Sequence, residues 1–273
     1  MDMGGKTVVM TGASAGIGAA AARQLHALGA RVVVVGRNPD KTASVAATVG
    51  GEFAVADFSK LSEVRELAAE LLDRFATIDV FANNAGGTFP RPSTTEDGHT
   101  LTLQTNHLAP YLLTRLLQER LVDSNATIIQ TSSAAHGIGH IDFDDLDAFP
   151  TVAGGFRAYG TSKLENILFT RELQRRWGAS GIRAASFHPG VVASEFGRNS
   201  FFTGLIYRPP FNRFMTSVDG GASTLTWLAT TDGWLPGGYY ANSKPASTTK
   251  AAQSEVDAEK LWDMSASMVG LQP

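Results

Sequence analysis

The sequence Thr7-Val-Val-Met-Thr-Gly-Ala-Ser-Ala-Gly-Ile-Gly18 joins a run typical of a buried strand to an Ala-rich helical pattern at residues 17–28. Gly12 can adopt the positive φ of a tight turn, Gly16 lets a phosphate approach the backbone, and Gly18 permits close packing of helix on strand. The free N–H groups at the start of the helix favour a pyrophosphate. This turn therefore predicts a dinucleotide site with these cofactor-binding candidates: Gly12, Ser14, Ala15, Gly16, Ile17 and Gly18.

The rest of the chain alternates between short apolar runs and helical patterns. Strands that are apolar throughout are usually buried on both faces, and their alternation with helices predicts a parallel, doubly wound α/β sheet. No linker or repeat divides the chain, so we expect a single domain over residues 1–273. The expected strands are residues 7–11, 31–35, 53–56, 78–82, 127–131, 182–187 and 238–241, and the expected helices are 17–28, 61–75, 101–121, 159–177 and 219–228.

Composition excludes several classes of function. The 273 residues carry 23 basic and 26 acidic side chains, so the chain lacks the excess of basic residues that would indicate nucleic-acid binding. Without Cys, disulfides, thiolate nucleophiles and Cys-ligated metals are excluded. The N-terminus lacks a signal-peptide pattern, and no apolar run approaches the ~20 residues of a membrane span. We therefore expect a cytoplasmic protein without a membrane anchor.

The residues after the second and third expected strands bear on the choice of dinucleotide. An acidic residue after strand two would bind the ribose 2′-hydroxyl of NAD, but the chain reads Gly36-Arg37-Asn38 there. Arg37 could bind a 2′-phosphate, so NADP(H) is favoured over NAD(H), unless Arg37 only faces solvent. Asp57 could accept from an adenine amino group, with Phe58 beside it, or could cap the following helix.

Ser14 permits a different interpretation. Gly12-Ala-Ser-Ala-Gly16 also fits the G-x-S-x-G nucleophile elbow of α/β-hydrolases, in which Ser14 would attack an ester. That elbow follows a strand deep in the sheet, whereas this one follows the first strand of the chain. A hydrolase is therefore kept only as an alternative.

A second constellation carries acid–base chemistry. Tyr159-Gly-Thr-Ser-Lys163 places a phenol and an amine four residues apart on one face of an expected helix. A nearby ammonium stabilises phenolate and lowers the pKa of a tyrosine. Polar side chains also follow three strands, at the edge of the sheet where ligands bind. They lie in the segments Asn83-Asn-Ala-Gly86, Ser132-Ser133 and Pro189-Gly-Val-Val-Ala-Ser194, with Gln104-Thr-Asn106 in a neighbouring helix.

Together these motifs resemble the short-chain dehydrogenase/reductase family over roughly Lys6 to Tyr240. The ordered motifs are T-G-x-x-x-G-I-G, N-N-A-G, an interior Asn, S-S, Y-x-x-x-K and P-G. Ser132-Ser-Ala-Ala-His136 and His188-Pro-Gly-Val-Val are similar to the retinol-dehydrogenase-like branch. The resemblance implies a Rossmann fold and an oxidoreductase that transfers hydride between a nicotinamide cofactor and a carbonyl or alcohol.

The resemblance also implies roles for individual residues. Tyr159 would be the general acid in reduction and the base in oxidation, and Lys163 would lower its pKa and hold the nicotinamide ribose. Ser133 would polarise the substrate carbonyl, although Ser132 stays open. Asn106 would hold a water that relays protons to Lys163. Further cofactor contacts are implied for Asn38, Asn83, Ala85, Gly86, Pro189, Gly190, Val192 and Ser194. Relatives often pair through the Tyr159 helix, which implies a homo-oligomer, either a dimer or a tetramer.

One spacing departs from the family pattern. Ser133 and Tyr159 lie 26 positions apart, about twice the usual gap. Irregular segments at 136–156 and 195–216 are expected to shape the substrate pocket. The pocket candidates are His136, Phe149, Phe156 and Phe196, which favour an apolar or aromatic substrate. No metal is expected, because the glycines between His136 and His140 disfavour a helix that would align them. A catalytically silent, dinucleotide-sensing relative is the remaining alternative.

Overall fold

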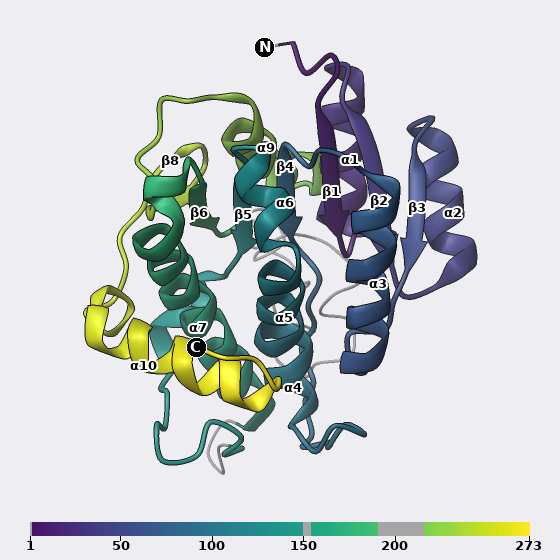
Figure 1. Ribbon diagram of the computed structural model, residues 1–273. Helices are drawn as coiled ribbons and strands as arrows, with labels where there is room; N and C mark the ends of the chain where they lie inside the picture. Colours follow the sequence, from purple (N-terminus) through teal and green to yellow (C-terminus); the bar gives the residue numbers. More distant parts are fainter. Residues whose placement is uncertain (1, 150–153, 191–215) are drawn as a thin grey trace, which may run out of the picture.

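The computed structural model describes residues 2–149, 154–190 and 216–273. Within them an eight-stranded sheet has the order β3-β2-β1-β4-β5-β6-β7-β8, parallel throughout except for the final β7–β8 pair (Figure 1). The predicted doubly wound α/β class is therefore confirmed. The strands are β1 (Thr7–Thr11), β2 (Arg31–Gly36), β3 (Glu52–Val55), β4 (Val80–Asn83), β5 (Thr127–Thr131), β6 (Arg183–Phe187), β7 (Tyr239–Ala241) and β8 (Lys244–Pro245).

Helices cover both faces of the sheet, and the central strands supply apolar side chains to each. Val9 of β1 packs with α3, α5 and α7, whereas its neighbours Val8 and Met10 pack with α1 and α9. This alternation explains why β1 is apolar throughout. The principal helices are α1 (Gly16–Ala27), α2 (Pro39–Thr48), α3 (Leu61–Arg74), α5 (Ala109–Leu116), α6 (Gln118–Asp123), α7 (Gly154–Trp177), α9 (Val218–Thr230) and α10 (Glu255–Met268).

The helix expected at residues 101–121 is present, but it is not one regular α-helix. The chain forms a short α4 (Leu101–Leu103), a π-helical turn η1 (Gln104–Leu108), and then α5 and α6. Pro110 in the first turn of α5 has no N–H to donate to the carbonyl of Asn106, so a regular α-helix cannot run through this point. The wider π turn contains Asn106, one of the candidate catalytic residues.

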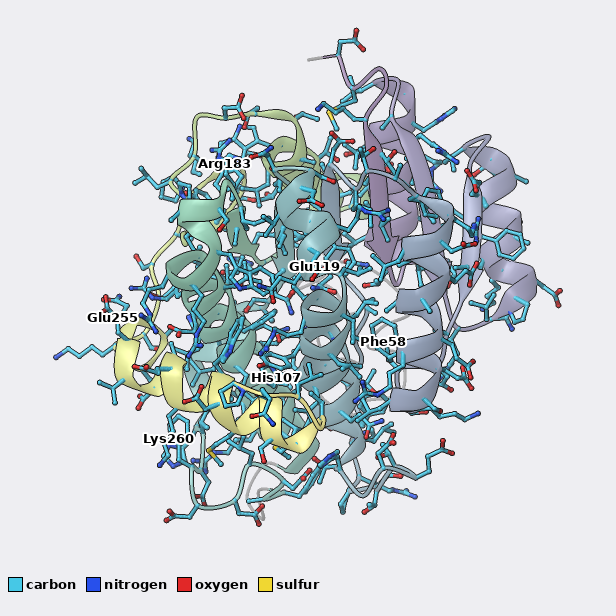
Figure 2. The ribbon with its side chains drawn as sticks, viewed as in Figure 1. Phe58, His107, Glu119, Arg183, Glu255 and Lys260 are labelled. Atoms are coloured by element: carbon cyan, nitrogen blue, oxygen red, sulfur yellow. The ribbon has the colours of Figure 1, made fainter. Side chains whose placement is uncertain are left out.

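The sequence patterns did not reveal the C-terminal helix α10. It lies across α7 and α5 (Figure 1) and buries Trp262 against Tyr111 and Phe169, at ring-centroid distances of 5.2 and 5.7 Å. His107 lies beneath α10 (Figure 2), and its Nε2 is 2.8 Å from the hydroxyl of Ser265. Part of the α7 surface expected to pair with a second copy is therefore covered by this chain's own helix.

The two irregular segments expected to shape the substrate pocket differ in how much of each the structure describes. Ile141 and Leu146 of segment 136–156 pack into the core beside α7, and Asp147 binds His99 at 2.8 Å. Segment 195–216 lies outside the described residues except for Thr216. No helix in the described ranges has the length and apolar character to cross a bilayer.

Candidate active site

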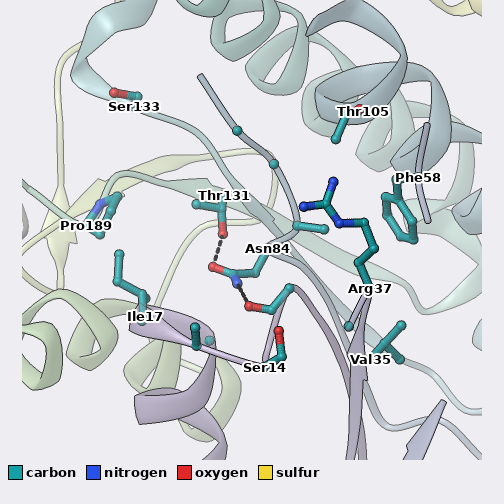
Figure 3. A pocket seen from close by; sticks show the side chains of 18 of the residues that line it. Ser14, Ile17, Val35, Arg37, Phe58, Asn84, Thr105, Thr131, Ser133 and Pro189 are labelled. Carbon is teal, nitrogen blue, oxygen red and sulfur yellow. Dashed lines mark hydrogen bonds between the residues drawn. The ribbon is translucent and has the colours of Figure 1, made fainter. Parts of the chain in front are cut away.

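A cavity of about 950 Å³ opens at the carboxyl ends of the parallel strands (Figure 3). Ligands bind at this edge in doubly wound sheets. Arg37 and Phe58 lie at one end of the view, and Ser133 and Pro189 lie at the other. The lining includes these predicted site residues: Gly12, Ser14, Ala15, Gly16, Ile17, Gly18, Arg37, Asp57, Phe58, Ala85, Gly86, Ser133, Tyr159, Lys163, Pro189 and Gly190.

The glycine-rich turn forms one wall and has the conformation expected for it. Gly12 has a φ of 63°, which favours glycine. A Cβ on Gly18 would overlap the Gly12 carbonyl oxygen and lie 2.7 Å from Nδ2 of Asn84. The turn is thus closed so tightly that only hydrogen fits at position 18. The turn lines a cavity whose size and glycine-lined wall suit a dinucleotide pyrophosphate, a group that the start of a helix favours.

Asn84 connects this turn to the next strand. Its Nδ2 donates to the carbonyls of Thr11 and Gly12 at 3.1 and 3.2 Å, and its Oδ1 accepts from Thr131 at 3.2 Å (Figure 3). The Thr11 hydroxyl oxygen in turn accepts from the amides of Asn84 and Ala85, both at 3.0 Å. The loops after β1, β4 and β5 therefore form one hydrogen-bonded unit.

The other end of the cavity carries a positive charge. Arg37 is exposed, lines the cavity and forms no ion pair with any described residue. Asp57 lines the cavity too, but its Oδ1 accepts from both the amide and the hydroxyl of Ser59, at 2.9 and 2.8 Å. That carboxylate therefore organises the turn before α3, but it does not cap the helix, whose N-cap is Lys60 and whose Leu61 amide donates to Asp97 at 2.9 Å. Arg37 is free to bind an anionic group of a ligand at this end.

Tyr159 and Lys163 lie on the cavity side of α7, as their spacing predicted. Tyr159 is only 8% exposed, and burial raises its pKa to about 12, while a hydrogen bond with Ser133 acts in the opposite direction. Lys163 Nζ lies 5.5 Å from the centre of the Tyr159 ring and donates to the Thr131 carbonyl at 3.1 Å. Burial lowers the pKa of Lys163 to about 8.

The net effect on Tyr159 differs from the expected one. The Lys163 ammonium was expected to lower the pKa of Tyr159, but in the described structure the loss of solvation outweighs every stabilising contact. The phenol therefore keeps its proton at neutral pH. A protonated phenol is the form that a general acid requires.

The two serines have different environments. Ser132 is buried and its hydroxyl donates to the carbonyl of Lys163 at 2.7 Å, so it fastens β5 to α7. The Ser133 hydroxyl bonds Tyr159, and its oxygen accepts from the Ala135 amide at 3.1 Å. Ser133 is therefore the serine whose hydroxyl shares the reacting end of the cavity with Tyr159.

Asn106 is held by hydrogen bonds within the protein, and the water relay expected of it stays a prediction. It is fully buried, its Oδ1 accepts from the Gly87 amide at 2.8 Å, and its Nδ2 donates to the Gly87 carbonyl and the Ser162 hydroxyl at 2.9 and 3.0 Å. Both Nδ2 hydrogens are thus committed to protein atoms. Asn106 fixes the Ala85–Gly87 wall of the cavity to α7.

Comparison with known proteins agrees with this geometry. A model described as short chain dehydrogenase matches residues 6–202. The chain belongs to the short-chain dehydrogenase family. It is 43% identical to "Putative daunorubicin C-13 ketoreductase DnrU" of Streptomyces sp. (strain C5), over 97% of this chain and 93% of that protein. It is 38% identical to retinol dehydrogenase 12 of Mus musculus, over 98% and 87%. An uncharacterized protein from Mycobacterium Paratuberculosis has a similar solved structure, with a TM-score of 0.81, 30% identity, and 99% and 96% coverage.

These matches establish a short-chain dehydrogenase of the retinol-dehydrogenase-like branch, and hence an oxidoreductase. Two predicted cofactor contacts nevertheless lie outside the cavity lining. Asn83 is buried, and its Nδ2 donates to Thr114 of α5 at 2.8 Å, because adjacent residues of a strand point to opposite faces. Asn38 is the N-cap of α2, where its Oδ1 accepts from the Lys41 amide at 2.9 Å.

The described residues that were predicted to form the substrate pocket of this short-chain dehydrogenase also lie outside the cavity lining. His136 is buried behind Ser133, Phe156 is 45% exposed on the surface, and neither these two nor Phe149 belongs to the described cavity lining. Val192, Ser194 and Phe196 lie outside the described residues. Several lining side chains were not predicted from the sequence, among them Asn84, Phe89, Leu101 and Thr105. Alternation along the chain predicts that Asn83 and Asn84 point in different directions, but not which of them lines the cavity.

Proposed function

We propose that this enzyme reduces a ketone or aldehyde with NADPH, and oxidises the corresponding alcohol more slowly. The observation that carries the proposal is the arrangement of the Tyr159 phenol, the Ser133 hydroxyl and the Lys163 amine at one end of a cavity whose other end suits a dinucleotide. Gly12 to Gly18, Arg37 and the Asn84–Gly87 segment would hold the cofactor, which supplies a hydride when bound.

The residues around the reacting centre would then deliver the proton to the substrate oxygen. The substrate oxygen would sit between the hydroxyls of Ser133 and Tyr159, and both would donate to it. As hydride reaches the carbonyl carbon, Tyr159 would transfer its proton to the oxygen and an alcohol would form. The Lys163 ammonium would stabilise the resulting phenolate until solvent restores its proton. The raised pKa of Tyr159 favours this direction at neutral pH, and one relative is named as a ketoreductase.

Preference for NADP(H) is proposed from Arg37. It is exposed at the end of the cavity beside Phe58, and no acidic residue follows β2 to bind a ribose 2′-hydroxyl. A guanidinium forms a charge-assisted, forked contact with phosphate that neutral side chains cannot provide.

The test compares kcat/KM for NADPH and NADH in the wild type and in Arg37→Asp. We expect the preference for NADPH to fall by at least ~10-fold, because a charge-assisted hydrogen bond contributes roughly 1.5–3 kcal/mol. Lys41→Asp is the matched control, since Lys41 is exposed on α2 and outside the described cavity lining. Equal preference in the wild type and Arg37→Asp would remove Arg37 from the cofactor site.

The substrate is proposed to be apolar or aromatic, because Phe89 and Leu101 line the cavity. A panel of aromatic ketones, aliphatic aldehydes and charged keto acids, followed by absorbance of the reduced nicotinamide, tests this. Turnover confined to the keto acids would refute it. Turnover of no carbonyl would favour the dinucleotide-sensing alternative. The hydrolase alternative lacks a base, because no histidine is among the described lining residues around Ser14.

A further inference from the structure

Three aromatic rings form a cluster directly behind Ser133, and the proposed reaction uses none of them. His136 belongs to the 3-10 turn η2 (Ala134–Ile138), Tyr239 lies on β7, and His188 follows β6. The ring centroids of His136 and Tyr239 are 5.0 Å apart at an interplanar angle of 72°, and those of Tyr239 and His188 are 5.7 Å apart at 30°. The ring cluster therefore joins three separate elements at the reacting end of the cavity.

The hydrogen bonds of His136 determine which of its nitrogens carries the proton. Nδ1 lies 2.8 Å from the carbonyl oxygen of Ser133. A carbonyl only accepts hydrogen bonds, so Nδ1 must be the donor. The Tyr239 hydroxyl is 3.4 Å from the same nitrogen, as a weaker second partner. The His136 backbone amide also donates to the Ser133 carbonyl, at 3.1 Å. Ring and backbone together hold this carbonyl in one orientation.

That carbonyl belongs to the residue whose hydroxyl faces Tyr159. Ser133 has an extended backbone with φ −156° and ψ 154°, and its hydroxyl bonds Tyr159. Fixing the Ser133 carbonyl fixes the direction of its Cα–Cβ bond, and the Ala135 amide and Tyr159 then hold the hydroxyl in one rotamer. A ring that does not itself line the described cavity can thus determine the geometry inside it.

His188 fixes the opposite side of the same region through the opposite tautomer. Its Nδ1 accepts from the Gly190 amide at 3.1 Å, so this nitrogen carries no proton. Gly190 has a φ of 82° and lines the cavity beside Pro189. Through Tyr239, the ring cluster thus connects the Ser133 turn with the Pro189–Gly190 turn.

We propose that His136 is a positioning residue for the reduction, donating from Nδ1 to hold Ser133 in place against Tyr159. The proposal rests on the proposed function, since Ser133 must contact the substrate oxygen for its position to affect the rate. Misplacement of a reacting group by about 1 Å can lower rates on the order of 100-fold, so a partial shift of Ser133 should be measurable.

The test compares two amide substitutions that differ in where the N–H is placed. The side-chain N–H of His136→Asn can occupy the position of Nδ1, whereas that of His136→Gln reaches only towards the position of Nε2. We expect Asn to keep kcat within roughly 3-fold of the wild type and Gln to lower it on the order of 10-fold. The Kd for NADPH should stay unchanged in both, and a larger deuterium isotope effect with labelled NADPH should accompany the Gln loss.

The control is His140→Gln, at an exposed position of the same segment, and it should behave as the wild type. A merely structural role for His136 would lower the melting temperature of the Asn and Gln variants alike and leave the kcat of the folded enzyme equal in both. Equal kcat values in the two variants would therefore overturn the proposal.

A second measurement does not depend on turnover. Nitrogen-15 NMR of the wild type distinguishes the two imidazole tautomers, and a proton on Nδ1 of His136 is the expected result. A proton on Nε2 alone would overturn the proposal, because no ring bond could then be donated to Ser133. Failure of the proposed function would instead appear as a wild type that turns over no carbonyl while its His136 keeps the Nδ1 proton.

Discussion

Replacing Asn106 with Ala tests how the cofactor wall is held. The substitution removes three hydrogen bonds, two to the backbone of Gly87 and one to Ser162. Ser162 keeps a partner, because its hydroxyl also donates to the carbonyl of Tyr159 at 2.8 Å. The amide and carbonyl of Gly87 lose the partner that Asn106 provided. At about 1–3 kcal/mol for each unsatisfied group, with partial access of water to Gly87, the free energy of unfolding should fall by about 3 kcal/mol.

The assay is chemical denaturation of the wild type and the variant, together with titration of NADPH. Stability should fall by the amount above, and the Kd for NADPH should rise because the Ala85–Gly87 wall is released. Thr105→Val is a stability control on the same π turn, since no described residue bonds its buried hydroxyl. A loss below about 1 kcal/mol in Asn106→Ala, or a loss as large in Thr105→Val, would refute the reasoning.

Two further predictions follow from burial. Lys163 is charged below its lowered pKa of about 8 and neutral above it, so kcat/KM for reduction should be constant on the acid side and fall as pH rises through about 8. Lys163→Met should be slow with no such fall, and an identical pH profile in that variant would contradict the role of Lys163. Trp262→Ala should lower the free energy of unfolding by about 3–5 kcal/mol, because Trp262 packs among Tyr111, Phe169 and Trp177. Denaturation measures this, and a loss under about 1 kcal/mol would mean that α10 does not secure the α5–α7 surface.

Much of the fold was predictable because its signals are local. The strand at residues 7–11 and the one at 127–131 have the predicted bounds, since apolar β-branched runs flanked by glycine or serine admit few alternatives. The glycine-rich turn and the Tyr159–Lys163 pair were also readable, because their spacings alone require a tight turn and a shared helical face. These features positioned most of the cavity correctly.

The remaining features depend on contacts distant in sequence. Helix α10 buries Ala258, Ser265 and Ala266 along with its larger residues, so its apolar pattern is weak. Asn83 and Asn84 are chemically identical, and only the direction of β4 in the sheet decides which one faces the cavity. The raised pKa of Tyr159 results from burial by several elements, which the local Tyr–Lys spacing does not encode.

The proposed reaction depends on the Tyr159 phenol supplying the proton in an NADPH-dependent reduction. The most direct measurement is single-turnover oxidation of bound NADPH by a ketone in Tyr159→Phe, beside NADPH titration of the same variant. We expect an unchanged Kd for NADPH and a rate lower by roughly 100-fold or more, the range for loss of a general acid. A variant that binds NADPH normally and reduces the ketone at the wild-type rate would contradict it.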